Sequence, residues 1–115
     1  MIKDTIHTRE VDTAYMRGVD LLQKRRYAKA LYILHEYCDR NTVVTLLSLG
    51  HDAQAFEMLD GLEQTATVEY LKAVACSRLG RKAEGREHFL TACGMDERMQ
   101  YRGNLDPEIT ELLKE

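Results

Sequence analysis

Proline is nearly absent from this chain, and several features of common protein classes are missing with it. The 115 residues include one proline, Pro107, and no tryptophan. Because proline breaks helices outside their first turn, its scarcity leaves nearly the whole chain free to be helical. No apolar run approaches the roughly 20 residues that a spanning helix requires, so we expect no membrane span.

The cysteines are too few and too scattered to form a disulfide framework or a zinc knuckle. Cys38, Cys76 and Cys93 are an odd number and include no CxxC pair. Free cysteine is among the residue types most often buried in proteins. We therefore predict three reduced cysteines that serve as small core residues.

The charge balance excludes a strongly basic or acidic surface. The formal net charge is −3, with both signs mixed along the chain. A surface that binds phosphate backbones is usually rich in one sign, so we expect no nucleic-acid partner. The first residues lack the apolar segment of a secretory signal, which indicates a cytoplasmic protein or a domain cut from a longer, exported chain.

Helical periodicity is what the sequence does contain, and it comes in pairs. Tyr15, Gly18, Val19 and Leu22 recur at intervals of three and four, and a second apolar stripe follows a short basic turn. A short loop between two amphipathic helices makes them antiparallel neighbours. The same design then repeats twice. The three predicted hairpins cover about residues 9–38, 41–63 and 66–93.

Glycine and β-branched residues set the expected limits of these helices. The Leu-Gly pairs at 49–50 and 79–80 predict helix ends, and Gly94 and Gly103 are expected to end two later helices. The β-branched stretch at 42–45 is compatible with a strand as well as a helix. We favour a helix, because no second strand is available to pair with it.

The tail, residues 95–115, differs from the hairpins. Asp106 followed by Pro107 predicts a helix start, and Ile109 and Leu112 give the last helix, residues 107–114, an apolar edge. Such a helix suits the exposed end of a helical stack. We therefore predict an all-α, single domain of residues 1–115, with three hairpins and a C-terminal capping helix.

The second helices of the hairpins share a pattern, in which a small residue is followed by further residues four and seven positions later. The three sets are Ala30, Leu34, Tyr37; Ala55, Leu59, Leu62; and Gly85, Phe89, Ala92. With the Leu-Gly pairs, the pattern resembles the tetratricopeptide repeat (TPR) over roughly residues 11–93. The resemblance is degenerate, because the spacing falls short of the family period of about 34 residues and the tryptophan-type position is empty. It implies a TPR-like α-solenoid.

The tail carries a second resemblance. The segment YRGNLDPEI after a hairpin array is similar to C-terminal helical modules of gut-bacterial cell-envelope proteins linked to fimbria-like assemblies. This resemblance implies a bacterial protein and a periplasmic or surface location. The compartment is left open between that and the cytoplasm.

The TPR resemblance also implies a function. Arrays of this family generally bind a peptide or partner protein along a concave groove, so it implies a non-enzymatic protein-interaction module. The alternative is a structural or self-associating helical domain that packs against the rest of a longer cell-envelope protein. The implied groove residues are Tyr15, Val19, Leu22, Gln23, Arg40, Val44, Leu47, Tyr70, Val74 and Arg78, with Asp12, Ser48 and Ser77 beside them. The apolar positions equally suit packing between hairpins, and the sequence leaves the two uses open.

A basic set offers a weaker alternative site for an acidic partner, although such charges are more typical of a solvated face. The set comprises Arg78, Arg81, Lys82 and Arg86.

Signals for catalysis are weak. His35 and Cys38 stand one helical turn apart, but no second pair at ligand spacing follows, so we expect no metal site. Neither a glycine-rich phosphate loop nor a GxSxG elbow is present. Glu57, Asp60 and Glu63 form an acidic edge that is usual on a solvated helix. We therefore predict no enzymatic activity and no cofactor.

Overall fold

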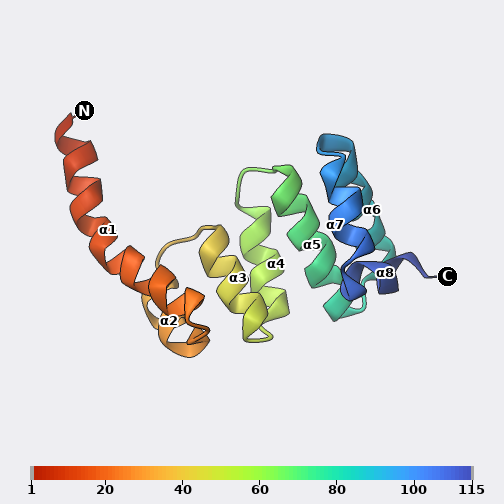
Figure 1. Ribbon diagram of the computed structural model, residues 1–115, viewed down its shortest axis with the longest axis horizontal. Coiled ribbons are helices and arrows are strands. Elements are labelled where there is room, and N and C mark those ends of the chain that lie inside the picture. Colours follow the sequence, from red (N-terminus) through yellow and green to blue (C-terminus); the bar gives the residue numbers. More distant parts are fainter. Residues whose placement is uncertain (1, 115) are drawn as a thin grey trace. The chain divides into compact units, whose positions relative to one another are not determined.

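The computed structural model describes residues 2–114, with side chains from Thr13 onward. All regular secondary structure within this range is helical (Figure 1), which confirms the all-α fold class. The β-branched stretch at 42–45 lies within a helix, as predicted. The helices are α1 (Ile2–Gln23), α2 (Tyr27–Leu34), α3 (Arg40–Ser48), α4 (Asp52–Asp60), α5 (Ala66–Leu79), α6 (Lys82–Met95), α7 (Arg98–Asn104) and α8 (Pro107–Leu113). None of the described helices is both long enough and apolar enough to cross a bilayer.

The contacts of the chain group into two compact units, and each is described by itself. Unit 1 is Met1–Gly50 and contains α1 to α3, whereas unit 2 is His51–Glu115 and contains α4 to α8. The division falls inside the predicted hairpin at 41–63. That hairpin and the single-domain organisation therefore stay predictions.

In unit 1, a tight turn joins α1 to α2. Arg25 adopts a left-handed φ of 62°, and the N–H of Arg26 donates to the carbonyl of Leu21 at 2.9 Å. This six-to-one bond is the hallmark of a Schellman motif, which closes α1 and reverses the chain. α2 then packs closely on α1, because a Cβ at Gly18 would lie 2.7 Å from Leu34 Cδ2.

The start of α3 is held by a polar cluster. Asp39 is the N-cap, and its Oδ1 accepts a bond from the N–H of Thr42 at 3.0 Å. The hydroxyl of Thr42 is fully buried and lies 2.9 Å from the carbonyl of Leu34 at the end of α2. The buried threonine thus satisfies backbone groups on the α2–α3 connection while Val43 enters the apolar core.

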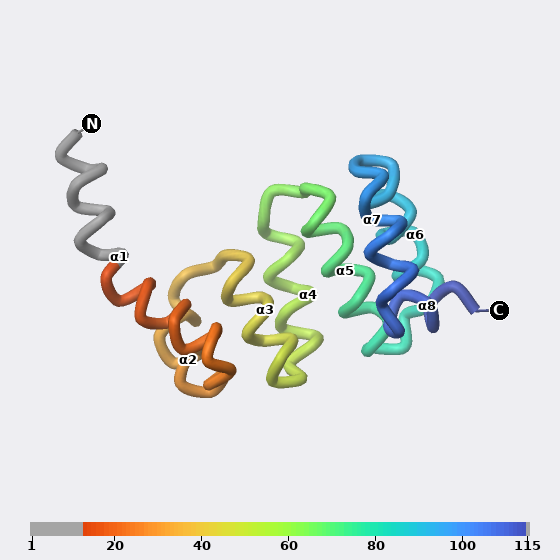
Figure 2. Tube along the Cα trace, in the orientation of Figure 1, coloured from red at the N-terminus to blue at the C-terminus, as the bar shows by residue number. Residues whose placement is uncertain are grey.

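Unit 2 is organised around α5, which is buried from Val68 to Cys76. Figure 2 shows α5 and α6 side by side. Gly80 is the C-cap of α5, in the turn between them. Gly80 has a φ of 76°, and the N–H of Arg81 donates to the carbonyl of Cys76 at 2.9 Å. The predicted helix end at Leu79-Gly80 is therefore confirmed. α4 packs on α5 as well.

α8 covers the α5–α6 hairpin. Pro107 occupies the first turn of α8, and Asp106 Oδ1 accepts a bond from the N–H of Glu108 at 3.0 Å, so the predicted helix start is confirmed. Ile109 and Leu112 are buried, and they join a core cluster with residues of α5 and α6. The C-terminal helix therefore caps this hairpin, as predicted.

Two glycines were expected to end helices, and both predictions are wrong. Gly94 lies inside α6, which continues to Met95, and Gly103 lies inside α7. A Cβ at Gly103 would stand 2.5 Å from ring atoms of Phe89. Tertiary packing therefore explains Gly103, since only glycine lets α7 approach the ring so closely.

The cysteines are free thiols, but they do not share one environment. Cys76 is fully buried, Cys93 is partly buried and Cys38 is exposed. The core placement is therefore wrong for Cys38, which follows the last turn of α2. Burial raises the pKa of the Cys76 thiol to about 11.

Candidate partner-binding site

A pocket of about 370 Å³ opens on α1 and the start of α3 in unit 1. Three of the predicted groove residues line it together with residues that the resemblance did not nominate. The lining residues are Tyr15, Met16, Val19, Asp20, Gln23 and Asn41. Five of these follow helical spacing on one face of α1, which is why a single helix supplies most of the wall.

Tyr15 is fixed in the pocket by side chains that follow α2. Its hydroxyl donates to Asp39 Oδ2, and Asn41 Nδ2 donates to the Tyr15 oxygen at 2.6 Å. The ring stands against Tyr37, with centroids 5.0 Å apart. Asp39 thus holds both the α3 N-terminus and the pocket tyrosine, so the aromatic wall is positioned before any partner arrives.

The rest of the pocket combines an exposed apolar side chain with polar groups. Met16 is 68% exposed. Asp20 forms an exposed ion pair with Lys24, with Lys24 Nζ 3.0 Å from Asp20 Oδ2. The pocket therefore offers apolar contact next to a partly neutralised carboxylate.

The remaining predicted groove residues of unit 1 do not line the pocket. Leu22 and Val44 are half-buried, Arg40 and Ser48 are exposed, and Leu47 is only 6% exposed. Leu47 therefore serves core packing, which was the alternative use left open for the apolar positions. The side chain of Asp12 lies outside the described residues.

Two predicted groove residues of unit 2 are core residues. Tyr70 is 1% exposed and Val74 is 6% exposed, and both belong to the cluster that includes Phe89 and Ile109. Burial raises the pKa of Tyr70 above its usual value, and its hydrogen bond to Asp106 acts in the same direction. A side chain this deeply buried is not accessible to a partner in this structure.

Arg78 and Ser77, also expected at the groove, are engaged by α8. Arg78 forms a two-pronged ion pair with Glu108, with Nε 2.5 Å from Oε2 and Nη2 3.0 Å from Oε1, and it contacts Asp52 at 3.1 Å. These bonds raise the Arg78 pKa above its usual value. The Ser77 hydroxyl donates to the carbonyl of Glu108 at 2.8 Å. The tail thus occupies the face of α5 that the resemblance assigned to a partner.

The arginines of the basic set make contacts within unit 2. Arg86 donates to the carbonyls of Leu112 and Lys114 at 2.7 and 2.6 Å, and so satisfies the end of α8. Arg81 lies over the ring of Phe56, 5.5 Å from its centroid. An acidic partner would have to compete with these contacts.

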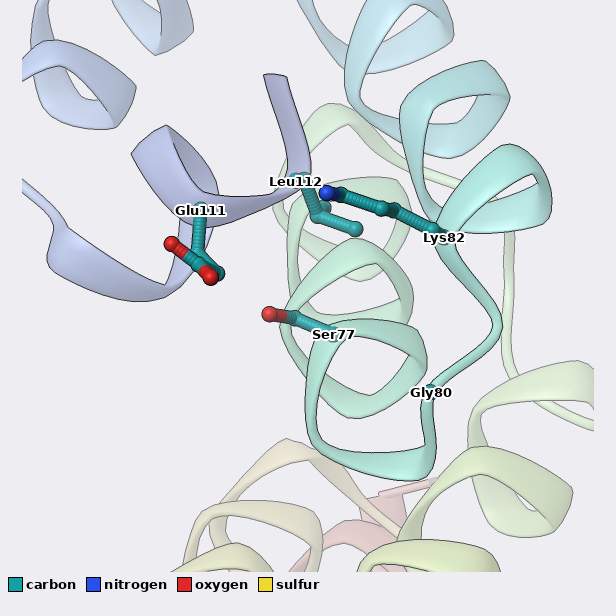
Figure 3. Close-up of a pocket in the computed structure, with 5 residues that line it drawn as sticks. All are labelled: Ser77, Gly80, Lys82, Glu111 and Leu112. Atoms are coloured by element: carbon teal, nitrogen blue, oxygen red, sulfur yellow. The ribbon is translucent and has the colours of Figure 1, made fainter. Parts of the chain in front are cut away.

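A second, smaller pocket of about 160 Å³ lies between α8 and the α5–α6 turn. Figure 3 shows Ser77 pointing from α5 toward Glu111, while Lys82 extends from the start of α6 toward Leu112. Lys114 and, less strongly, Lys82 hold the pKa of Glu111 below its usual range. Ser77 is bonded to α8 and Glu111 is paired with Lys114, so we do not assign a partner to this pocket.

A buried charge network in unit 2 has no counterpart in the predictions. Glu69 and Lys72 on α5 are 7% and 6% exposed. Lys72 Nζ lies 2.9 Å from Asp60 Oδ1 and 2.5 Å from Gln64 Oε1, and Glu69 Oε1 lies 2.7 Å from His88 Nδ1. Two opposite charges three residues apart on a helix with strong apolar content were the available signal. His35 and Cys38, the candidate ligand pair at which the sequence predicted no metal site, are both exposed.

Comparisons with models of protein families, with curated proteins and with solved structures find no match to this chain. The TPR resemblance and the bacterial cell-envelope origin therefore stay predictions.

Proposed function

We propose that the chain is a non-enzymatic, TPR-like protein-interaction module whose contact site is the α1–α3 pocket of unit 1. The proposal is supported by one observation above others. Tyr15, Val19 and Gln23, which the TPR resemblance nominated, line a single pocket whose aromatic wall is held by Asp39 and Asn41. A site positioned before binding loses less entropy when a partner docks.

The size and the lining side chains of the pocket favour one class of partner. Its volume falls in the range that accepts a large side chain or a small ligand. Met16, Val19 and the Tyr15 ring favour an apolar anchor, while the Asp20 carboxylate favours a basic residue beside it. The occupant is therefore a short peptide segment that inserts one large apolar side chain next to a lysine or arginine.

The test is a selection of random displayed peptides on the full chain, followed by fluorescence anisotropy with the enriched peptides. We expect enriched sequences to share an apolar residue next to a basic one. The Met16→Asp variant should weaken binding by at least tenfold, because it places a charge in the apolar part of the pocket.

The matched control is Tyr32→Asp, since Tyr32 on α2 is 82% exposed and does not line the pocket. This variant should bind the peptide as the parent chain does. Circular dichroism on both variants checks that helicity is retained. The pocket is not the site if no peptide is enriched, or if both variants bind equally well.

Self-association is the second candidate function, and a separate observation favours it. Unit 2 exposes large apolar side chains, with Leu90 at 63%, Tyr101 at 71% and Leu105 at 86%. Exposed apolar residues of this size often mark contact surfaces when they gather in one patch. Light scattering over a concentration series distinguishes the candidates, because a chain that stays monomeric at high micromolar concentration does not act by assembling with itself.

A further inference from the structure

Three side chains with metal-binding atoms converge where α5 packs on α6. The sulfur of Cys76, a carboxylate oxygen of Glu84 and a ring nitrogen of His88 all lie within 4.8 Å of one another. Glu84 and His88 are one turn apart on α6, so they share a face of that helix. We propose that Cys76, Glu84 and His88 form a binding site for a zinc ion, with the fourth position of the tetrahedron open.

The orientation of His88 is an independent indication of a metal site. Its Nδ1 lies 2.7 Å from Glu69 Oε1, and its Nε2 faces Glu84 Oε2 at 3.8 Å. When Nδ1–H donates to the buried carboxylate, the lone pair of Nε2 is directed to the side where Glu84 stands. Metal-binding histidines almost always make such a bond from their other nitrogen, which fixes the tautomer and the ring.

Neighbouring side chains hold this arrangement without a metal. Lys72 stands 3.8 Å from Glu69 Oε2 and is itself bound to Asp60, so the Glu69 carboxylate is fixed on both sides. Phe56 of α4 meets the His88 ring edge-on, with centroids 5.9 Å apart. The histidine is therefore oriented by contacts from two helices besides its own.

The types of the three donor atoms indicate which metal ion the site would bind. A thiolate, an imidazole and a carboxylate match zinc, whereas magnesium and calcium require sets of oxygen donors. Two cations, Lys72 and Arg81, oppose a bound cation, but Lys72 is paired with Asp60 and Arg81 lies over Phe56. Zinc binding releases the Cys76 proton, because the thiolate is the ligand.

The experiment uses Co²⁺ as a visible substitute for zinc on the full, reduced chain. We expect one equivalent of Co²⁺ to give a sulfur-to-cobalt charge-transfer band and the intense visible bands of tetrahedral cobalt, and Zn²⁺ to abolish both. The bands should be lost in Cys76→Ser, and both Glu84→Gln and His88→Gln should weaken cobalt binding at least tenfold.

Matched controls come from the same chain. Cys38→Ser removes an exposed thiol, and Glu87→Gln removes an exposed carboxylate on α6, so both should keep the bands. Glu84 is 46% exposed in its side chain, so its variant tests binding without disturbing the core. The proposal is overturned if the folded chain gives no charge-transfer band, if the band survives in Glu84→Gln or His88→Gln at full affinity, or if Cys38→Ser abolishes it.

Discussion

The hydroxyl of Tyr70 donates to Asp106 Oδ2 at 2.7 Å, which ties α5 to the N-cap residue of α8. Asp106 uses its other oxygen to cap α8. Arg102 covers the tyrosine from α7, with its guanidinium carbon 4.2 Å from the ring centroid. One buried side chain therefore links three helices of unit 2, and this explains why Tyr70 does not face a groove.

Replacing Tyr70 tests this role directly. Tyr70→Phe should lower the free energy of unfolding by about 1 kcal/mol, because only the hydrogen bond is lost. Tyr70→Ala should lower it by about 4 kcal/mol through the cavity it leaves. Urea denaturation followed by circular dichroism measures both. Tyr101→Phe is the control, since Tyr101 is 71% exposed and should change stability by less than about 0.5 kcal/mol.

Two glycines inside helices should respond in opposite directions to alanine. Gly103→Ala should destabilise the protein by about 2 kcal/mol, because its Cβ would press on the Phe89 ring. Gly94→Ala should stabilise it by about 0.5 to 1 kcal/mol, because the added carbon meets no atom within 4 Å apart from its own stretch of helix backbone, and alanine favours the helix. Thermal unfolding of the two variants provides the comparison. Equal effects would contradict the close packing of α7 on Phe89.

The turn between α1 and α2 holds an arginine in a backbone conformation that suits glycine. Arg25→Gly should raise the free energy of unfolding by about 0.5 to 1 kcal/mol, because the left-handed conformation costs a non-glycine residue roughly 1 to 2 kcal/mol and glycine adds some entropy to the unfolded chain. Lys24→Gly is the control, since Lys24 precedes Arg25 and does not have a positive φ. That variant should destabilise the protein or leave it unchanged. A loss of stability in Arg25→Gly would contradict the Schellman geometry.

The buried thiol of Cys76 predicts a pH dependence of stability. Its pKa is raised from 9.0 to about 11 by burial, so between these values the unfolded chain binds fewer protons than the folded one. The stabilisation that this thiol contributes is present below about pH 9 and is lost as the pH rises toward 11. The parent chain should therefore lose stability more steeply over this range than Cys76→Ala does, as measured by urea denaturation at each pH. Parallel pH profiles would contradict the prediction.

Local signals predicted the helices well because helix limits depend on neighbouring residues. The cap at Asp39, the glycine stop at Gly80 and the Asp106-Pro107 start each act within one turn of the chain, so they can be recognised from a few letters. Gly94 and Gly103 share the composition of stop signals, yet neither ends a helix. Packing against Phe89 explains the glycine at position 103, and Phe89 lies fourteen positions away in the sequence.

The candidate sites show the same difference between what local sequence signals predict and what tertiary packing decides. The TPR resemblance nominated Tyr15, Val19 and Gln23, and these residues lie together because their spacing places them on one face of α1. Tyr70 and Val74 had the same spacing but are buried in a cluster with residues of α6 and α8. A periodic pattern of apolar residues identifies one face of a helix, but it does not show what packs on that face. A neighbouring helix and a binding partner would leave the same pattern in the sequence.

The sequence by itself determined the helical content and several helix limits, because these follow from backbone preference and from the periodic burial of side chains. Only the tertiary structure decided that the tail occupies the face of α5, and that Cys76, Glu84 and His88 lie together. The physical reason is that such contacts join residues on different helices. Their distances depend on how the helices pack, which no local preference specifies.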